Sequence, residues 1–376
     1  MSVSYIPAKV KYALWAQSAG RCEYEGCNKI LWQDLVTKAK YSTAYIAHII
    51  ADKEGGPRGH KVLSERLKCD LSNLMLLCDA HHRLVDKEDE KGYPVERLQD
   101  MKKRHEKRVR ILTALEDDKQ SHVLHYGANI GRLNARITWR KSFEAMVPHK
   151  FPAEETAIEL SLRNSPFIDE ESRYWEIEQQ SLQRQFTDKV RPRLSTDISH
   201  LSVFALAPQP LLIELGRLLS DVSAIDVYQH QKEPEDNWKW QDGEDTIPFE
   251  IYCLNEKRSN VALNISLSAN IANHRIYSIL GEDTCIWTLA IKEPYNDFLK
   301  KRVQLQLFRE TFRKLLNRIK FIHGQNALLN IFPAVPVSIA VEIGRVWMPK
   351  ADMPLRIYDQ NSASGGFIRT LEIVSQ

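Results

Sequence analysis

The 376-residue sequence contains no run of about 18 consecutive apolar residues, so it is not expected to span a membrane. Its first residues, Met1–Pro7, have neither the basic nor the apolar region of a secretory signal peptide. Only six cysteines occur, at positions 22, 27, 69, 78, 253 and 285, and they are too scattered for a disulfide scaffold. These absences favour a cytoplasmic protein with some metal-binding thiols.

The composition is that of a soluble chain, with 43% hydrophobic and 27% charged residues, and its length allows two domains. The charge is unevenly spread. Residues 1–120 hold 22 Lys and Arg against 18 Asp and Glu, whereas the remaining 30 Lys and Arg face 31 Asp and Glu. The N-terminal part is therefore the better candidate for binding a polyanion.

Four potential zinc ligands form two closely spaced pairs, Cys22-x₄-Cys27 and Cys78-x₂-His81. Zn²⁺ takes four such ligands in a closed tetrahedron, and a small domain gains much of its stability from the ion. Each cysteine alone is compatible with a buried apolar thiol, and the paired spacing is what favours metal. Because neighbouring helical residues point to different faces, His81 and His82 should serve different metals, and the spacing favours His81 for zinc.

Three further residues are of the types that phosphodiester hydrolysis needs. The reaction requires a base, a hard cation on the phosphate, and a group that holds the base still. An imidazole titrates near neutrality, so His48 is the candidate base. Asn73 is the candidate for fixing a loop or orienting that base, and His82 for holding the catalytic divalent ion.

The order of these three residues, together with the cysteine pairs, resembles the HNH endonuclease family across residues 20–90. The resemblance implies a ββα-metal fold, a catalytic ion such as Mg²⁺, and cleavage of DNA. By position, His48 matches the general base of the family, Asn73 its central asparagine and His82 its metal-binding histidine.

One position departs from the family pattern. Many members carry an acidic metal ligand just before the first histidine, and this chain has Ala47 there. The cation then needs another oxygen, from Asp52, Asp79, Asp86 or water. Magnesium tolerates few protein ligands, so activity is compatible with this departure.

The order of apolar and polar residues also predicts local structure in the N-terminal part. It predicts a helix over 8–19 that ends at Gly20, a strand over 45–50 and a short helix near 78–85. Residues 95–117 predict a longer helix with an apolar face and a basic face. Its position after the nuclease motif favours DNA contacts by Lys102, Lys103 and Arg104, with a solvated helix surface as the alternative. A charged run at 117–121 predicts a domain over 1–120 and a connector over 121–145.

An internal repeat marks the C-terminal part, with copies near 199–230 and 328–360. Residues 204–218 align without a gap on 332–346, and Phe, Pro, Glu, Gly and Arg coincide. Each copy reads as a strand, a Pro-containing turn, a helix and a second strand, which is an α/β crossover unit. We therefore predict two Rossmann-like halves within residues 146–376, with chance similarity of two apolar helices as the alternative.

The segments Ser199–Pro208, Asn330–Ala340 and Arg356–Gln360 resemble the SAVED family over roughly residues 150–376. The resemblance implies a fused pair of CARF-like units that senses cyclic oligonucleotides. An N-terminal HNH nuclease joined to SAVED resembles the effector nucleases of cyclic-oligonucleotide anti-phage signalling (CBASS). In that family a cyclic dinucleotide or trinucleotide drives oligomerisation, here into a dimer or tetramer, and the assembled nuclease degrades double-stranded DNA.

Ligands of α/β sheets bind beyond the carboxyl ends of the strands, where helix N-termini offer free N–H groups to phosphate. The turns at 207–210 and 335–338 are predicted to lie there. The candidate nucleotide-binding residues are Trp240, Phe332, Pro336, Arg345 and Tyr358. For each aromatic residue the alternative is that it packs in the core and does not touch the ligand. For Arg345 the alternative is an ion pair with an acidic residue of its own half.

Two competing functions stay open. The first is a restriction-type HNH endonuclease whose C-terminal half reads modified DNA, against which the near-neutral charge of that half argues. The second is a zinc-knuckle binding module with an inactive HNH site, which Ala47 motivates. Cleavage without added nucleotide favours the first, and any cleavage lost in His48→Ala excludes the second.

Overall fold

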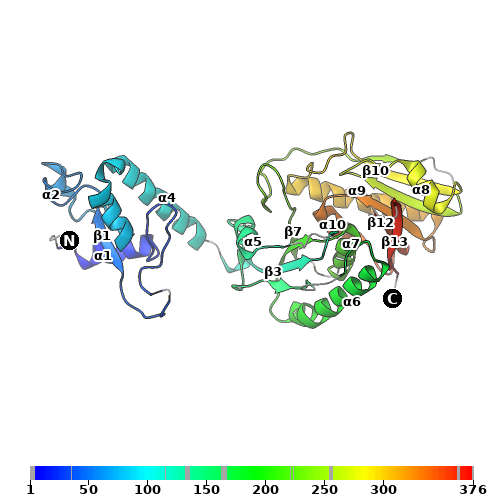
Figure 1. The fold of residues 1–376 in the computed structure, drawn as a ribbon, viewed down its shortest axis with the longest axis horizontal. Helices are drawn as coiled ribbons and strands as arrows, with labels where there is room; N and C mark the ends of the chain where they lie inside the picture. The colour runs from blue at the N-terminus through cyan, green and yellow to red at the C-terminus, as the bar shows by residue number, and fades with distance from the viewer. Residues whose placement is uncertain are drawn as a thin grey trace. The chain divides into compact units, whose positions relative to one another are not determined.

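The structure, a computed structural model, describes residues 5–34, 36–114, 116–131, 136–161, 167–220, 222, 224–253, 257–361 and 365–374. The chain divides into two compact units, Met1–Glu116 and Asp117–Gln376, called unit 1 and unit 2 below. Figure 1 shows the elements of each unit.

Unit 1 consists of short helices around a two-stranded sheet. Strands β1 (Ala44–His48) and β2 (Leu74–Cys78) pair antiparallel, with Ala44 opposite Cys78. Helix α3 (Asp79–Arg83) follows β2 directly and continues into a π-helical turn, Leu84–Glu88. The remaining elements are α1 (Ala8–Gln17), α2 (Leu63–Leu67), α4 (Val95–Thr113) and the 3₁₀ turns Leu71–Asn73 and Glu90–Gly92.

The core of unit 1 forms where these elements meet. Every residue of β2 is buried, and Leu14 of α1 and Leu98 of α4 pack into the same cluster. The chain leaves α1 at Gly20, whose φ of 63° is a backbone conformation that glycine adopts readily. The helices predicted over 8–19 and 95–117 are confirmed, and both end a few residues earlier than predicted.

The first half of unit 2 is a parallel sheet in the order β4-β3-β6-β7, with β5 also pairing with β3. A 3₁₀ turn, Asp117–Lys119, precedes it, and another, Arg191–Ser195, precedes β6. The other elements are β3 (Gln120–Gly127), α5 (Trp139–Met146), β4 (Phe151–Pro152), β5 (Ile158–Glu159), α6 (Ser172–Lys189), β6 (Leu201–Leu206), α7 (Gln209–Leu218) and β7 (Ile225–Val227).

The second half is a mixed sheet in the order β13-β12-β11-β9-β10-β8, parallel in the centre and antiparallel at both edges. Its elements are β8 (Glu250–Tyr252), β9 (Asn260–Ser266), α8 (Asn273–Leu280), β10 (Thr284–Ala290), α9 (Arg302–His323), β11 (Leu329–Ala334), α10 (Val337–Val346), β12 (Leu355–Asn361) and β13 (Gly366–Ile373).

The repeat predicted from the sequence is confirmed in the elements. Strand β11 lies 128 positions after β6, residue for residue, and α10 lies 128 positions after α7. The sheet order β3-β6-β7 of the first half recurs as β9-β11-β12 in the second. Unit 2 is therefore built from two related α/β halves.

Helices α7 and α10 pack against each other where the halves meet (Figure 1). A Cβ added to Gly216 would lie 1.9 Å from the carbonyl oxygen of Val341, and one added to Gly344 would lie 1.9 Å from that of Ile213. Val341 and Ile213 are again 128 positions apart, so the contact is pseudo-symmetric. Glycine recurs in the repeat because the two helix backbones approach this closely.

The segment predicted as a connector, 121–145, contains β3 and α5 instead. β3 pairs with β6 inside the first sheet, so the α/β fold begins before residue 121. The strand is hard to recognise because buried polar residues, Ser121, His122 and His125, interrupt its apolar pattern. In the fold the His125 imidazole is satisfied by Glu159, 3.0 Å away, and Ser142, 2.8 Å away.

Candidate metal centre and ligand pocket

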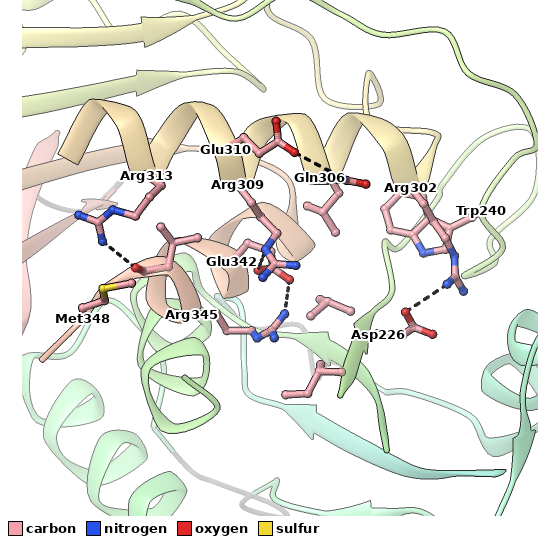
Figure 2. A pocket seen from close by; sticks show the side chains of 14 residues that line it. Asp226, Trp240, Arg302, Gln306, Arg309, Glu310, Arg313, Glu342, Arg345 and Met348 are labelled. Carbon is pink, nitrogen blue, oxygen red and sulfur yellow. Dashed lines mark hydrogen bonds and ion pairs between the residues drawn. The ribbon is translucent and has the colours of Figure 1, made fainter. Parts of the chain in front are cut away.

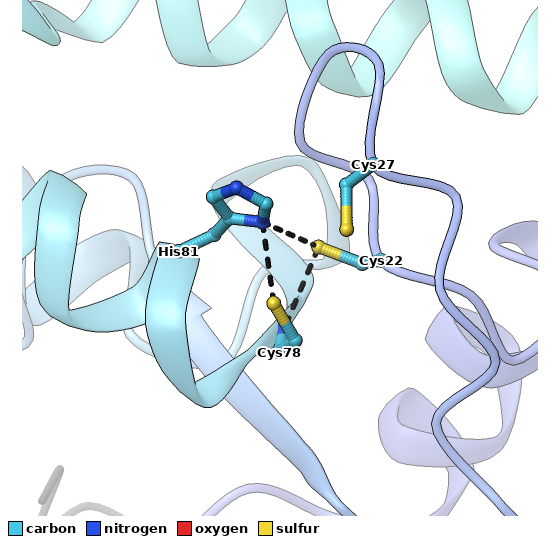
Figure 3. A group of neighbouring side chains, drawn as sticks. All are labelled: Cys22, Cys27, Cys78 and His81. Carbon is cyan, nitrogen blue, oxygen red and sulfur yellow. Dashed lines mark hydrogen bonds between the residues drawn. The ribbon is translucent and has the colours of Figure 1, made fainter. Parts of the chain in front are cut away.

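The side chains of Cys22, Cys27, Cys78 and His81 converge in unit 1 (Figure 3). Their four ligand atoms all lie within 4.8 Å of one another. His81 Nδ1 is 3.2 Å from Cys78 Sγ and 3.6 Å from Cys22 Sγ. Tetrahedral zinc, with Zn–S near 2.3 Å, needs sulfur atoms roughly 4 Å apart, so the residues fit this ion.

The surroundings of the cluster support a metal. Burial raises the pKa of the Cys22 thiol, so thiolates here require a compensating positive charge, which Zn²⁺ provides. The ring of Tyr24 stacks on His81 with centroids 3.8 Å apart and planes 3° from parallel, which fixes the imidazole with Nδ1 facing the thiols. The structure thus brings together the four residues selected from the sequence as zinc ligands, with His81 rather than His82 among them.

Asn73, just before β2, links this strand to the segment that leaves β1. Its Nδ2 donates to the Ile50 carbonyl at 2.8 Å and to the Leu67 carbonyl at 3.2 Å, while its Oδ1 accepts from the Ile50 amide at 2.8 Å. The residue is buried, so these bonds form in a medium that strengthens them. They hold the chain that leaves β1 just after His48.

His48, at the end of β1, is buried, and its ring nitrogen Nε2 lies 2.9 Å from the Lys68 carbonyl oxygen. A carbonyl oxygen only accepts, so Nε2 is the protonated nitrogen and donates this bond. Nδ1 then carries the lone pair. This is the tautomer that a general base needs.

His82, on helix α3, stacks on Tyr45 of β1, with centroids 4.8 Å apart. Its Nε2 is 3.3 Å from Asp86 Oδ2. Burial lowers the pKa of His82, although the Asp86 carboxylate opposes the effect, and a neutral imidazole is the form that binds metal.

Arg58 connects His82 to the end of β1. Its guanidinium bonds the carbonyls of Ile49 and Val85 at 2.7 Å each and approaches the His48 carbonyl at 3.4 Å. It also pairs with Asp86 Oδ1 at 2.5 Å, which leaves Oδ2 facing His82. Nothing in the sequence pattern singled out Arg58, because its partners lie 9 to 28 residues away.

The three acids considered in place of Ala47 differ in position. Asp86 is beside His82, whereas Asp79 pairs with Arg83 at 3.1 Å on the surface. Asp86 is therefore a carboxylate that the structure brings to the candidate ion site.

The basic face of α4 is less available than the sequence implied. Lys102, expected to contact DNA, is only 5% exposed and lies 2.5 Å from Glu106 and 4.0 Å from Glu23. Arg104 pairs with Glu25 at 2.9 Å. Lys103 is exposed. The neutralising acids at 23 and 25 lie about 80 residues upstream, which helical periodicity within α4 cannot reveal.

The predicted nucleotide-binding residues fall into two groups. Phe332 and Tyr358 stack on each other, 4.4 Å between centroids, inside a buried cluster, as their equivalents Phe204 and Tyr228 do at 4.3 Å. In this structure these rings form core. Pro336 precedes α10 at the carboxyl end of β11, where the turn was predicted.

Trp240 and Arg345 instead line a cavity of about 560 Å³ between the halves (Figure 2). Three more arginines, Arg302, Arg309 and Arg313, project into it from one face of α9. These arginines are spaced by seven and four residues, which places them on one face of a helix, and this spacing could have identified them from the sequence.

Each of these arginines has an acidic partner. Glu342 accepts from Arg345 at 2.7 Å and faces Arg309 at 3.1 Å. Arg302 pairs with Asp226 at 3.1 Å, and Arg313 with Asp352. The buried Nε of Arg345 has no hydrogen-bond partner among the described residues, so one donor stays available.

The fold and its sites define the class: an α/β unit of two related halves, with an arginine-lined cavity, joined to a small unit with a zinc-type ligand cluster. The family model described as "SMODS-associated and fused to various effectors sensor domain", abbreviated SAVED, matches residues 182–373. The chain belongs to the SAVED family. The predicted SAVED sensor is thus confirmed, within the bounds expected for it, and the match lies entirely in unit 2.

Three solved structures are similar to this chain. The Cap4 SAVED/CARF-domain receptor of Acinetobacter baumannii with the cyclic trinucleotide 2′3′3′-cAAA is 13% identical, with a TM-score of 0.42, and the match covers 74% of this chain and 60% of that one. The same receptor alone is 12% identical, with a TM-score of 0.43 and coverages of 74% and 58%. The Cap4 SAVED/CARF-domain receptor of Moraxella osloensis is 11% identical, with a TM-score of 0.38 and the same coverages of 74% and 58%. The chain spans less than two thirds of each. No curated protein matches it. Among the described residues, no helix combines the length and the apolar character of a bilayer span.

Proposed function

We propose that the chain is a cyclic-oligonucleotide-activated, metal-dependent endonuclease of double-stranded DNA that acts as an anti-phage effector. Membership of the SAVED family supports the sensor part. The observation that carries the nuclease part is the set of contacts in unit 1: Asn73 fixes the chain after His48, while His82 and Asp86 present a nitrogen and an oxygen 3.3 Å apart.

His48 is the proposed general base. Its Nε2–H is engaged by the Lys68 carbonyl, so Nδ1 is the atom that takes a proton from the attacking water. Asn73 acts as a positioning residue, because its three bonds hold the backbone next to the base. A fixed base avoids reorganisation during the reaction.

The proposed ligands of the catalytic divalent ion are His82 and Asp86. Two ligands on one octahedral ion at about 2.1 Å lie roughly 3 Å apart, and the separation of Nε2 and Oδ2 fits this. A bound Mg²⁺ would polarise the scissile phosphate and stabilise the leaving oxygen. Arg58 keeps Asp86 turned towards His82 by bonding the other carboxylate oxygen.

The cavity at α9 and α10 is the proposed ligand site. Its volume lies in the range of small-molecule sites, roughly 300–1,000 Å³. Four guanidiniums line it, each also bonded to an acidic residue, and Arg345 keeps one unused donor for a phosphate. Trp240 offers a ring for stacking a base. A cyclic dinucleotide or trinucleotide that binds better to an assembled dimer or tetramer shifts the population towards it.

A plasmid-cleavage assay tests the proposal. The purified chain, with Mg²⁺, is given a panel of cyclic dinucleotides and trinucleotides. We expect cleavage with one class of ligand, abolished by EDTA and reduced at least about 100-fold by His48→Ala. His274→Ala, which removes an exposed histidine from unit 2, is the matched control and should cut normally.

Two results would replace the proposal. Equal cleavage without any nucleotide indicates the restriction-type enzyme. No cleavage with any ligand and metal, in a chain that still binds zinc, indicates an inactive zinc-knuckle module.

In the sensor, Arg309→Ala should weaken ligand binding by about tenfold or more, whereas Lys314→Ala, on the same helix but outside the cavity lining, should not.

A further inference from the structure

The loop that joins α1 to β1 combines positive charge with exposed aromatic side chains. We call residues 29–43 the arm, of which 29–34 and 36–43 are described. Lys29, Lys38 and Lys40 are all exposed. Trp32 is 45% exposed and Tyr41 is 52% exposed. Asp34 is the arm's sole acidic residue in the sequence, which leaves a formal charge of +2.

The arm is ordered by its own hydrogen bonds. At its base, the Thr43 amide donates to the Leu31 carbonyl at 2.8 Å and Leu31 is fully buried. Near its tip, the Asp34 amide donates to the Ala39 carbonyl at 2.9 Å, and Asp34 Oδ1 accepts from the Thr37 amide at 2.7 Å. The exposed parts of Trp32 and Tyr41 gain nothing from burial, and exposed apolar groups that gather on one surface commonly bind a partner.

Three observations favour DNA as the partner. The lysines of the arm form no ion pair among the described residues, so their charge is available to phosphates, whereas two of the three α4 residues selected from the sequence, Lys102 and Arg104, are paired with acids. The arm lies in the unit with the positive charge balance. It also runs directly into β1, whose Tyr45 stacks on His82, the proposed ion ligand.

We infer that the arm is the principal DNA-contacting surface of unit 1, with Lys38 and Lys40 neutralising backbone phosphates and Tyr41 packing against the sugar or bases. The inference rests on the proposed function, since it takes duplex DNA as the substrate. It moves the DNA contact from α4, where helix periodicity had suggested it, to a loop next to the candidate ion site.

The experiment measures duplex binding by the full chain carrying His48→Ala, with Ca²⁺ in place of Mg²⁺, by fluorescence anisotropy at several salt concentrations. Lys38→Ala/Lys40→Ala is compared with Lys103→Ala/Lys107→Ala, an equal charge change on two exposed residues of α4. Each phosphate contact contributes about 0.9 to the slope of log K against log salt. The arm pair should lower that slope by nearly 2 and weaken binding about tenfold or more, whereas the α4 pair should leave the slope unchanged.

Tyr41→Ala supplies a second readout. It should weaken binding at every salt concentration without changing the slope, whereas Tyr12→Ala, which removes a still more exposed tyrosine on α1, should have no effect. The inference is overturned if the arm and α4 pairs lose the same slope, or if arm variants change only the oligomer mass, which would make the arm a contact between copies. If the parent chain binds no DNA with any cyclic nucleotide, it is the proposed function that fails.

Discussion

The two units of this chain are stabilised in different ways. Unit 1 has, among its described residues, a two-stranded sheet with five residues in each strand. The loop that carries Cys22 and Cys27, the end of β2 and helix α3 meet at four potential zinc ligands. Unit 2 has two larger sheets whose halves interlock through α7 and α10. We expect zinc at this cluster to be the main source of stability in unit 1 beyond its small apolar core, whereas unit 2 distributes its stability over a repeated, apolar interface.

The difference decides how each unit responds to damage. A ligand cluster is lost as a whole when one ligand is removed, because zinc requires the full set. A repeated interface loses only the contacts at the altered site, and the corresponding alteration in the other half should cost a similar amount.

The largest effect is expected from Cys78→Ser. Removing one ligand, or adding a strong chelator, should unfold unit 1, since structural zinc contributes on the order of 10 kcal/mol to small domains. Unit 2 should keep its own unfolding transition. Calorimetry with hydrogen exchange of each unit, together with the zinc content, measures this. Cys69→Ser is the control, because Cys69 Sγ contacts the Tyr5 carbonyl and lies outside the cluster. A Cys78→Ser chain with both transitions intact would contradict the zinc assignment.

The next effect is a pH dependence of the stability of unit 2. Burial raises the pKa of Asp359 from 3.8 to about 7, and the charge of Asp169 adds to the shift. The folded state therefore binds more protons than the unfolded state between these values, so stability falls as pH rises from about 4 to 7 and is flat above. The change is at most about 4 kcal/mol, and smaller to the extent that water reaches this partly exposed residue.

Asp359→Asn should remove this slope and stabilise unit 2 at pH 8. Denaturant unfolding at several pH values measures it, with Asp188→Asn on the exposed side of α6 as the control. An unchanged slope in Asp359→Asn would show that another group titrates.

A smaller, paired effect is expected at the helix contact. Gly216→Ala and Gly344→Ala each place a Cβ 1.9 Å from a carbonyl oxygen of the opposite helix, which should cost about 1–3 kcal/mol in either case. Gly366→Ala, which meets open space, should be neutral within about 0.5 kcal/mol. Unequal losses at the two paired glycines would show that the halves interlock less symmetrically than their sequences repeat.

The sequence allowed the repeat and the zinc-type cluster to be predicted for a common physical reason. Helix and strand periods place residues of one copy in the same environment as those of the other, so Phe204 and Phe332 coincide in sequence and in packing. Metal ligands need specific residue types at short spacing, so Cys22, Cys27 and Cys78 were recognisable before their convergence was known.

Tertiary partners were what the sequence could not reveal. Lys102 reads as a basic surface residue until the fold brings Glu23 beside it, and Tyr358 reads as a stacking platform until it is enclosed with Phe332. Arg58 and the arginines of α9 were missed because their roles depend on carboxylates and carbonyls from other elements. Strand β3 was missed because its histidines are satisfied only in the folded sheet.

The smallest expected effect concerns a glutamate–arginine pair that recurs in both halves, Glu214–Arg217 and Glu342–Arg345. The two glutamates differ in the charge of their other neighbours. Glu214 bonds Arg217 at 2.6 Å and Gln183 at 2.6 Å, whereas its equivalent Glu342 bonds Arg345 at 2.7 Å and also faces a second cation, Arg309, at 3.1 Å. Both carboxylates are buried, so each is costly to leave unpaired.

Removing the recurring arginine should therefore cost more in the first half. Arg217→Ala leaves Glu214 with an uncharged amide, while Arg345→Ala leaves Glu342 with Arg309, and we expect a difference of about 1 kcal/mol in unfolding free energy. The double variant Arg309→Ala/Arg345→Ala leaves Glu342 without either arginine, and it should lose more unfolding free energy than Arg217→Ala. If Arg217→Ala and Arg345→Ala cost the same, Arg309 contributes nothing to the buried carboxylate and is held in the cavity for another reason, such as contact with an anionic ligand.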